Sequence, residues 1–385
     1  MSGVDPATAQ DAERTLSSRR RDAARHLLHP RQWSDSMLLS LQPSLRNATL
    51  AGLQAAITAA LALPMVHLSP WSHLIGFASL GALVALFGRF APSRKRIRIL
   101  LLCGLCQVLA VLVMSAAAWL GAPTGVQLVM LALACALFLF VSVTGQFGAP
   151  GPLIFVFAAG ASTSDGLAFQ QVVERTAATA AVAALAWIVC AASEALRHLP
   201  SPERPFPVEP ERPLSHRLMA AARSAAGAGI AIFASHALGA SHPAWAAMGA
   251  LAVMQGAHLH ITMSRALQRM AGTLVGAMLA WALLTQAPSV WLVISVLVGL
   301  QLLTEMVIGI NYAFGQVFVT PMALLMTYLG AARTVGPEMA PERVLDTILG
   351  AMVGIAMAVL LSTIDDRRHL AERSRAAPAP GPLRG

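Results

Sequence analysis

The amino-acid sequence predicts an all-α protein that crosses a membrane about twelve times, as two parallel repeats of six helices. Of its 385 residues, 56% are hydrophobic and only 12% are charged, which is too little polar surface to cover a water-soluble globule of this size. Twelve apolar runs are long enough, or nearly so, to cross roughly 30 Å of hydrocarbon as helices. The third observation is an internal sequence similarity, an echo of the first half of the chain in the second.

The echo is clearest at the start of two apolar runs. Val173-Glu174-Arg175 opens a run in the first half, and Glu342-Arg343-Val344 opens a similar run 168 residues later. Since a fixed offset is the signature of internal duplication, we expect two tandem halves. Two further pairs of segments correspond at similar offsets, namely Ser69-Pro70-Trp71 with His242-Pro243-Ala244-Trp245, and Gly151-Pro152-Leu153 with Thr320-Pro321-Met322.

The chain is predicted to contain five segments. They are a basic tail at 1–46, a first six-helix repeat at 47–196, a linker at 197–215, a second six-helix repeat at 216–364 and a tail at 365–385. The spans expected in the first repeat are 48–66, 71–90, 99–120, 125–143, 147–163 and 171–193. Those expected in the second are 217–238, 244–261, 269–286, 289–310, 311–330 and 342–363.

The distribution of basic residues predicts the orientation. If the N-terminus is cytoplasmic, every Lys and Arg except Arg175, Arg333 and Arg343 falls on the cytoplasmic side, including those of a predicted loop at Ser264–Arg269. This is the bias of the positive-inside rule. Because each half has an even number of spans, both halves enter from the same side and form a parallel repeat. We therefore expect a plasma-membrane protein with both termini in the cytoplasm. Its basic tail either lies on anionic membrane lipid as an amphipathic helix or is disordered.

Several classes of function are excluded by composition. The net charge of +9 could suggest nucleic acid, but the basic residues lie between apolar runs and not on a soluble domain. The four cysteines lie inside apolar runs, where no metal-ligand set surrounds them. No phosphate-binding loop, nucleophile elbow or dinucleotide fingerprint occurs. We expect neither an enzyme nor a bound cofactor or metal.

Charged residues inside the predicted spans are the first candidates for a site. A charge near the bilayer centre costs about 2.5–3.5 kcal/mol on insertion scales. Asp346 lies one turn inside the last span and Arg343 precedes it by three residues, so the pair is either a proton-coupled site or an ion pair at a helix end. Glu305 has no local base and either faces a polar cavity or reaches water. Arg175 and Arg343 would attract an anion.

Interruptions in the fifth and eleventh spans are the second signal. Both runs contain Gly and Pro at corresponding positions, and paired broken spans in transporters mark the binding site because freed backbone groups face the cavity. A plain proline kink is the alternative interpretation. The residues expected to line the cavity are Gln146, Pro152, Asn311, Tyr312, Gln316, Thr320 and Pro321.

Four motifs in the second half occur in a familiar order. They are Ser241–Met248, Arg265–Gly276, Asn311-Tyr312 followed by Thr320-Pro321, and Glu342–Gly350. With these motifs, the segment from about 216 to 363 resembles the fusaric acid resistance-like family of bacterial inner-membrane transporters, which is related to the aromatic acid exporters. The resemblance implies a multi-pass carrier or channel for organic anions, sometimes beside a periplasmic adaptor protein. The short linker departs from the longer exporters of this kind, which have a sizeable cytoplasmic domain.

The sequence thus predicts a transporter that exports a small, aromatic organic anion. Proton coupling through Asp346 or Glu305 is an added hypothesis. The alternatives are an anion channel, which needs no titrating acid, and a non-transporting membrane scaffold. Both a homo-oligomer and an adaptor protein remain open as partners.

Overall fold

The computed structural model describes residues 36, 39, 42–198, 206, 213–255, 259–331 and 335–361. The predicted C-terminal tail, most of the N-terminal tail and linker, and Arg333 lie outside the described residues. Within these ranges all regular structure is helical, which confirms the all-α prediction. Nine helices in the described part of the chain are long and apolar enough to cross a membrane.

The helices follow the predicted spans closely in most places. The first half contains α3 (Leu45–His67), η1 (Ser72–Leu74), α4 (Ile75–Ala82), η2 (Leu83–Leu86), α5 (Ser93–Trp119), α6 (Thr124–Thr144), α7 (Leu153–Ala161), α8 (Phe169–Ala192) and η3 (Glu194–Leu196). The second half contains α9 (Leu214–Ala237), α10 (Ala244–Met254), α11 (Leu259–Leu284), α12 (Val290–Val307), α13 (Tyr312–Gly330) and α14 (Met339–Leu360).

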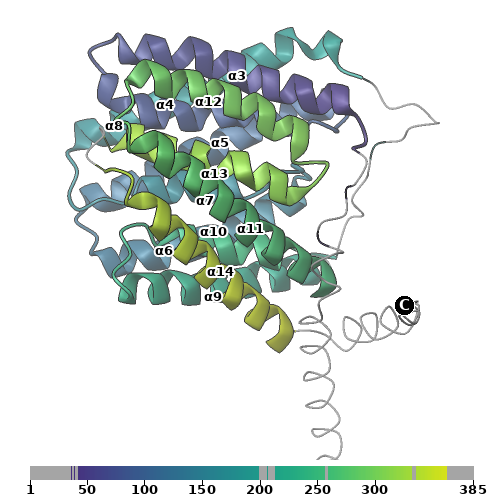
Figure 1. The fold of residues 1–385 in the computed structure, drawn as a ribbon, viewed down its shortest axis with the longest axis vertical. Helices are drawn as coiled ribbons and strands as arrows, with labels where there is room; N and C mark the ends of the chain where they lie inside the picture. Colours follow the sequence, from purple (N-terminus) through teal and green to yellow (C-terminus); the bar gives the residue numbers. More distant parts are fainter. Residues whose placement is uncertain are drawn as a thin grey trace, which may run out of the picture.

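The helix ends gather at two ends of the bundle (Figure 1). At the end that we call the linker end, the side chains of Arg46 and Asn47 bond the carbonyl oxygens of Leu196 and His198, just after α8. At the opposite end, the His67 ring meets the Trp291 ring with centroids 5.3 Å apart. The start of α3 and the finish of α8 therefore share one end, as the predicted topology requires.

Three predicted spans, at 71–90, 147–163 and 244–261, form shorter helices than expected. Every residue of α4 is buried, as is all of α10 from Ala244 to Val253, and α7 and α10 lie in the middle of the bundle in Figure 1. Because neighbouring helices surround them, these helices need not cross the bilayer alone. Their apolar sequences resemble those of full spans, which is why length was overestimated.

The two predicted interruptions have different outcomes. The fifth span is broken, because a turn with positive φ angles at Gly148 and Gly151 precedes α7. The eleventh is not, because α13 runs without a break through Pro321. A proline leaves the carbonyl four residues earlier without its helical donor. Here that carbonyl, on Val317, faces Gly276 of α11.

Small residues let α11 and α13 approach closely. A Cβ on Gly272 would lie 2.3 Å from the Ala313 carbonyl oxygen, and one on Gly276 would lie 2.7 Å from that of Val317. Two glycines four residues apart are the typical close-packing pattern of membrane helices. Nearer the start of α11, the segment Ser264–Arg269 is helical, although it was expected to be a cytoplasmic loop. Its arginines are thereby placed on the side of a helix and not in a connection.

Packing between the halves is reciprocal. The first helix of the first half, α3, packs against α12, and the first helix of the second half, α9, packs against α6. Figure 1 shows the α3–α12 pair along its upper edge and the α6–α9 pair along its lower edge. This arrangement is compatible with the predicted six-helix repeats, which remain a prediction.

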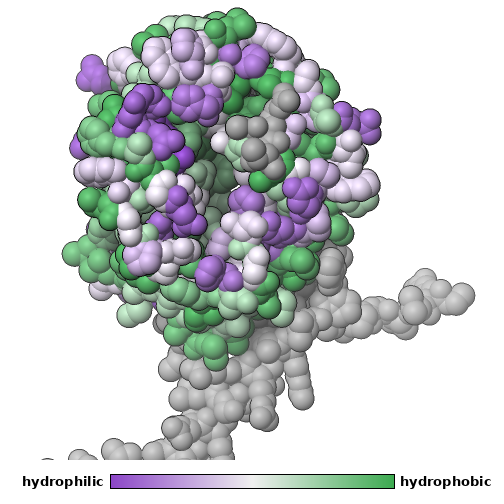
Figure 2. Space-filling view, turned by 90° about the vertical axis from the view of Figure 1, so that its left-hand side faces the viewer, coloured by the Kyte–Doolittle hydropathy of each residue, from purple (hydrophilic) through white to green (hydrophobic). Residues whose placement is uncertain are grey.

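The outer surface has the character expected of a lipid-facing protein. On α5, Leu101, Leu105 and Leu109 recur every four residues and are 55%, 51% and 51% exposed. Figure 2 shows the opposite end of the bundle, where hydrophilic side chains gather around a recess while hydrophobic ones cover the flanks. An apolar belt between polar ends suits a membrane and not water.

The contact between α11 and α13 generates a stability prediction. We expect Gly272→Ala to lower the melting temperature of the detergent-purified protein, because overpacking a close contact costs about 1–3 kcal/mol. Gly299→Ala is the matched control, since nothing lies within 4 Å of a Cβ there. Both changes gain helix propensity. Equal melting temperatures for the two variants would contradict this account of the packing.

Candidate functional site

A cavity of about 1140 Å³ lies inside the bundle and is lined by both halves. At the linker end its wall includes the exposed residues Thr144, Gly148 and Ala149. Toward the opposite end its wall includes Met326 and Arg343, which are 3% and 1% exposed. The cavity is thus accessible from the linker end and bounded by buried side chains at the other.

Positive charge dominates the lining. Among the described residues of the wall, five are arginine and one is acidic. A cavity with a low-dielectric wall and one sign of charge concentrates ions of the opposite sign. The arrangement therefore suits an anion. The charged lining residues are Arg89, Arg217, Arg265, Arg269, Arg343 and Glu305.

Glu305 is buried and paired. Its Oε2 accepts a hydrogen bond from Nη1 of Arg89, and the two side chains are only 5% and 11% exposed. Sequence inspection found no local base because Arg89 lies 216 residues earlier, in the first half. The ion pair joins the halves across the cavity wall and neutralises one of the five arginines.

Arg269 is held by residues that the sequence singled out. Its Nη1 donates to the Tyr312 hydroxyl at 2.9 Å and to Gln316 Oε1 at 3.5 Å. The side chain is buried, and within the described residues its Nε has no hydrogen-bond partner. Tyr312 and Gln316 therefore orient a guanidinium that still has a nitrogen available. Arg269 itself was noted only as part of a family motif and not as a site residue.

Arg343 has the least satisfied guanidinium in the cavity. It lies over the Trp245 ring at 5.3 Å from the centroid, and its Nε and Nη1 find no hydrogen-bond partner among the described residues. A buried donor without a partner costs about 1–3 kcal/mol. An anion that accepts from these nitrogens would recover that cost.

Asp346 differs from its predicted role as the ion-pair partner of Arg343. Its Oδ1 accepts a hydrogen bond from the Ser235 hydroxyl at 2.7 Å, whereas no ion pair within 4 Å joins it to Arg343 in the described residues. Its carboxylate is buried but is not part of the cavity wall. Spacing on a helix placed the two residues on neighbouring faces, but packing against α9 gives the acid Ser235 as its hydrogen-bond partner.

The remaining candidates divide into lining and packing residues. Asn311 caps α13 by accepting from the Ala313 amide at 2.8 Å, and Gln146 accepts from Lys95. Both line the cavity together with Pro152. Outside the lining, Thr320 contacts Thr273 at 3.5 Å. Pro321 contacts Gly276 in the α11–α13 interface, and Arg175 lies over the Phe77 ring at 4.8 Å.

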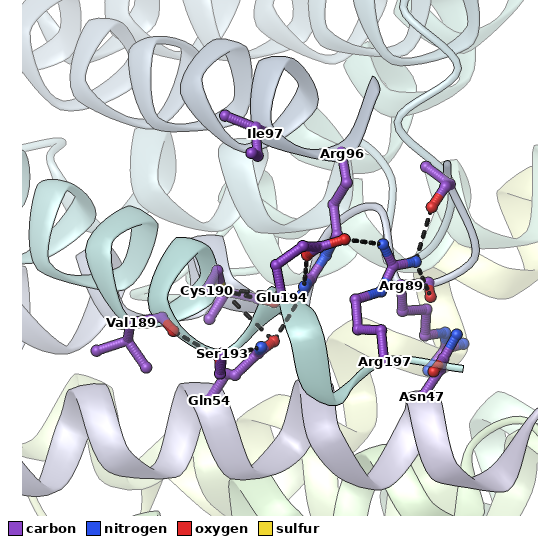
Figure 3. Close-up of polar contacts among 12 residues, drawn as sticks. Asn47, Gln54, Arg89, Arg96, Ile97, Val189, Cys190, Ser193, Glu194 and Arg197 are labelled. Atoms are coloured by element: carbon purple, nitrogen blue, oxygen red, sulfur yellow. Dashed lines mark hydrogen bonds and ion pairs between the residues drawn. The ribbon is translucent and has the colours of Figure 1, made fainter. Parts of the chain in front are cut away.

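A buried polar network at the linker end supports the wall (Figure 3). Arg96 donates to Glu194 at 3.1 Å and to Gln54 at 2.6 Å. Arg197 donates to Glu194 at 2.5 Å and to the backbone carbonyl of Arg89 at 2.9 Å. This network fixes the backbone of the residue that pairs with Glu305. Sequence inspection missed it, because its members come from three distant segments, near residues 54, 89–96 and 194–197.

The cross-half ion pair generates the next prediction. Glu305→Gln should strand a buried positive charge and destabilise the protein by about 3–5 kcal/mol, read as a fall in melting temperature. The double variant Arg89→Gln/Glu305→Gln should recover much of the loss. Glu174→Gln serves as a control, since its partner His73 is half-exposed and such pairs contribute little. A single Glu305→Gln variant as stable as the parent would contradict the pairing.

Comparison with known proteins finds one family that matches part of the chain. Residues 230–357 match the family described as fusaric acid resistance protein-like. A relative in Bacillus subtilis (strain 168), described as the uncharacterized membrane protein YvaC, is 34% identical over 137 residues. The match covers 34% of this chain and 22% of the relative, so the chain spans about a fifth of that protein's length. No solved structure matches the chain significantly.

The matched segment includes the last part of α9, all of α10 to α13 and most of α14, and with them Arg269, Arg343 and Glu305. It falls within the range over which the motifs showed a resemblance. Residues 230–357 are therefore a fusaric acid resistance protein-like segment of a membrane protein, as the sequence motifs indicated.

Proposed function

We propose that the protein is a membrane transporter that moves a small organic anion through the cavity between its halves. The observation that supports this best is the pair of buried arginines, Arg269 and Arg343, which line one cavity and keep nitrogens without a hydrogen-bond partner among the described residues. A carboxylate can accept two parallel hydrogen bonds from a guanidinium. Neither arginine has an acidic partner within ion-pair distance in the described residues.

The rest of the wall favours an anion with an apolar body. Phe157, Met322 and Met326 line the cavity beside the arginines, and methionine and aromatic side chains suit flat or irregular apolar groups. An aromatic carboxylate satisfies both parts of the wall. This substrate class is also the one that the family resemblance implies.

The proposed mechanism is alternating access by a carrier. A cavity accessible at one end and closed by buried side chains at the other favours a carrier over a channel. The reciprocal pairing of α3 with α12 and of α6 with α9 supports two parallel six-helix repeats that move against each other. With the linker end facing the cytoplasm of the plasma membrane, the cavity would load from inside and export its anion.

The first test is transport of aromatic carboxylates into proteoliposomes. We expect Arg343→Gln and Arg269→Gln each to raise the KM about tenfold to a hundredfold, because a hydrogen bond to a charged group contributes about 1.5–3 kcal/mol. Arg175→Gln is the matched control, since Arg175 lies outside the cavity.

Each variant should elute from size exclusion as the parent does. Unchanged KM values for both cavity variants, or an equal effect at Arg175, would rule out this site.

Proton coupling through Asp346 is a separate part of the proposal. Its Oδ2 is buried and lacks a partner among the described residues, so the carboxyl could take up a proton without losing a hydrogen bond. We expect Asp346→Asn to transport but to lose its response to an imposed pH gradient. A variant that keeps the full response would show that Asp346 is structural, and the Ser235 hydrogen bond would then explain it.

A further inference from the structure

The two halves build the same four-residue cluster at the opposite end of the bundle. Each cluster contains a histidine, an aromatic residue, a glutamate and the arginine that follows it. The glutamate, the arginine and the aromatic residue are each separated from their counterparts by 168 residues. The clusters are His73, Phe77, Glu174 and Arg175 in the first half, and His242, Trp245, Glu342 and Arg343 in the second.

The second-half cluster reaches from the protein surface to the cavity. Nδ1 of His242 lies 3.2 Å from Glu342 Oε2, and the His242 ring stacks on Trp245 with centroids 4.2 Å apart and planes 9° apart. Arg343 then lies over the same indole. The side chains of His242 and Glu342 are 24% and 21% exposed, whereas Trp245 and Arg343 are 2% and 1% exposed.

The first-half cluster repeats the histidine–glutamate and arginine–aromatic contacts in a different setting. Nε2 of His73 lies 3.2 Å from Glu174 Oε2, and the Arg175 guanidinium lies 4.8 Å from the Phe77 ring centroid. Arg175 is not part of the cavity wall, whereas Arg343 is. Comparing the two clusters therefore separates their shared role in packing from the role that only the second-half cluster can have beside the cavity.

We propose that the second-half cluster is the gate that closes the cavity at the opposite end, with Trp245 as its plug and the His242–Glu342 pair as its latch. Figure 2 shows that this end has a recess rimmed by hydrophilic side chains, from which a released anion could leave. The proposal rests on the proposed transport function and adds the route by which substrate controls access.

Arg343 links occupancy to the gate. Its guanidinium lies over the indole of Trp245, and Arg343 is also one of the residues that line the cavity. An anion that takes the available nitrogens of Arg343 draws positive charge away from the ring face and weakens the cation–π contact. Glu342 immediately precedes Arg343 on α14, so a shift of Arg343 also moves the latch. Binding can therefore shift the balance between closed and open states.

Cysteine accessibility tests the gate without any substrate. Ala323 lines the cavity and is 7% exposed, so Ala323→Cys is the reporter. The four native cysteines are retained as background, because Cys103, Cys135 and Cys190 are buried and none of the four lines the cavity. An impermeant thiol reagent is applied to membrane vesicles of each orientation.

With the parent gate, the reporter should be labelled from the linker end and protected from the opposite end. Adding His242→Ala or Glu342→Gln should raise labelling from the opposite end by about tenfold or more, as expected when a closed state loses its latch. His73→Ala and Glu174→Gln are the matched first-half controls and should leave labelling unchanged.

Unchanged labelling in both second-half variants, or an equal rise in the first-half controls, would overturn the gate. Retained labelling from the linker end shows that each variant is folded. Because the labelling needs no anion, it tests the gate even if the transport assay detects no transport. A latch variant that labels as expected in a protein that moves no carboxylate would refute the proposed substrate and keep the gate.

Discussion

Charge held away from water is the constraint on which the rest of this structure depends. A buried guanidinium must be paired or given hydrogen-bond acceptors, and the protein meets this need unequally. Arg96 donates to Glu194 and Gln54, and Arg89 pairs with Glu305. Neither Arg269 nor Arg343 has an acidic partner within ion-pair distance among the described residues. This unequal treatment distinguishes structural arginines from those that we assign to the substrate.

The helix packing makes room for those arginines. Most full-length helices expose apolar side chains, whereas the full-length α13 and the short helices α4 and α10 are largely buried. The short helices α4, α7 and α10 end close to the cavity. Glycines bring α11 against α13 and α10 against α14, where a Cβ on Gly350 would lie 2.1 Å from the Ala246 carbonyl oxygen. Close backbone contact at these interfaces fixes the helices that position Arg269 and Arg343.

Hydrophobic length and motif order predicted much of this from the sequence. The all-α class, the nine long helices and the lining positions of Tyr312 and Gln316 were accessible because they depend on local pattern. The Arg89–Glu305 pair was not, because its partners are 216 residues apart. The short length of α10 could not be predicted either, because an apolar run has the same composition whether lipid or protein surrounds it. Asp346 was placed beside Arg343 by helical spacing, but Ser235 of a neighbouring helix determined its contact.

The central claim is that Arg269 and Arg343 hold the carboxylate of an organic anion within one cavity. The most direct measurement is anomalous scattering from crystals of the full chain grown with 4-iodobenzoate. The account predicts an iodine peak inside the cavity, beside Phe157 or the methionine wall, with the carboxylate on one or both arginines. An iodine peak only outside the cavity, with both guanidinium groups contacted by protein alone, would contradict it.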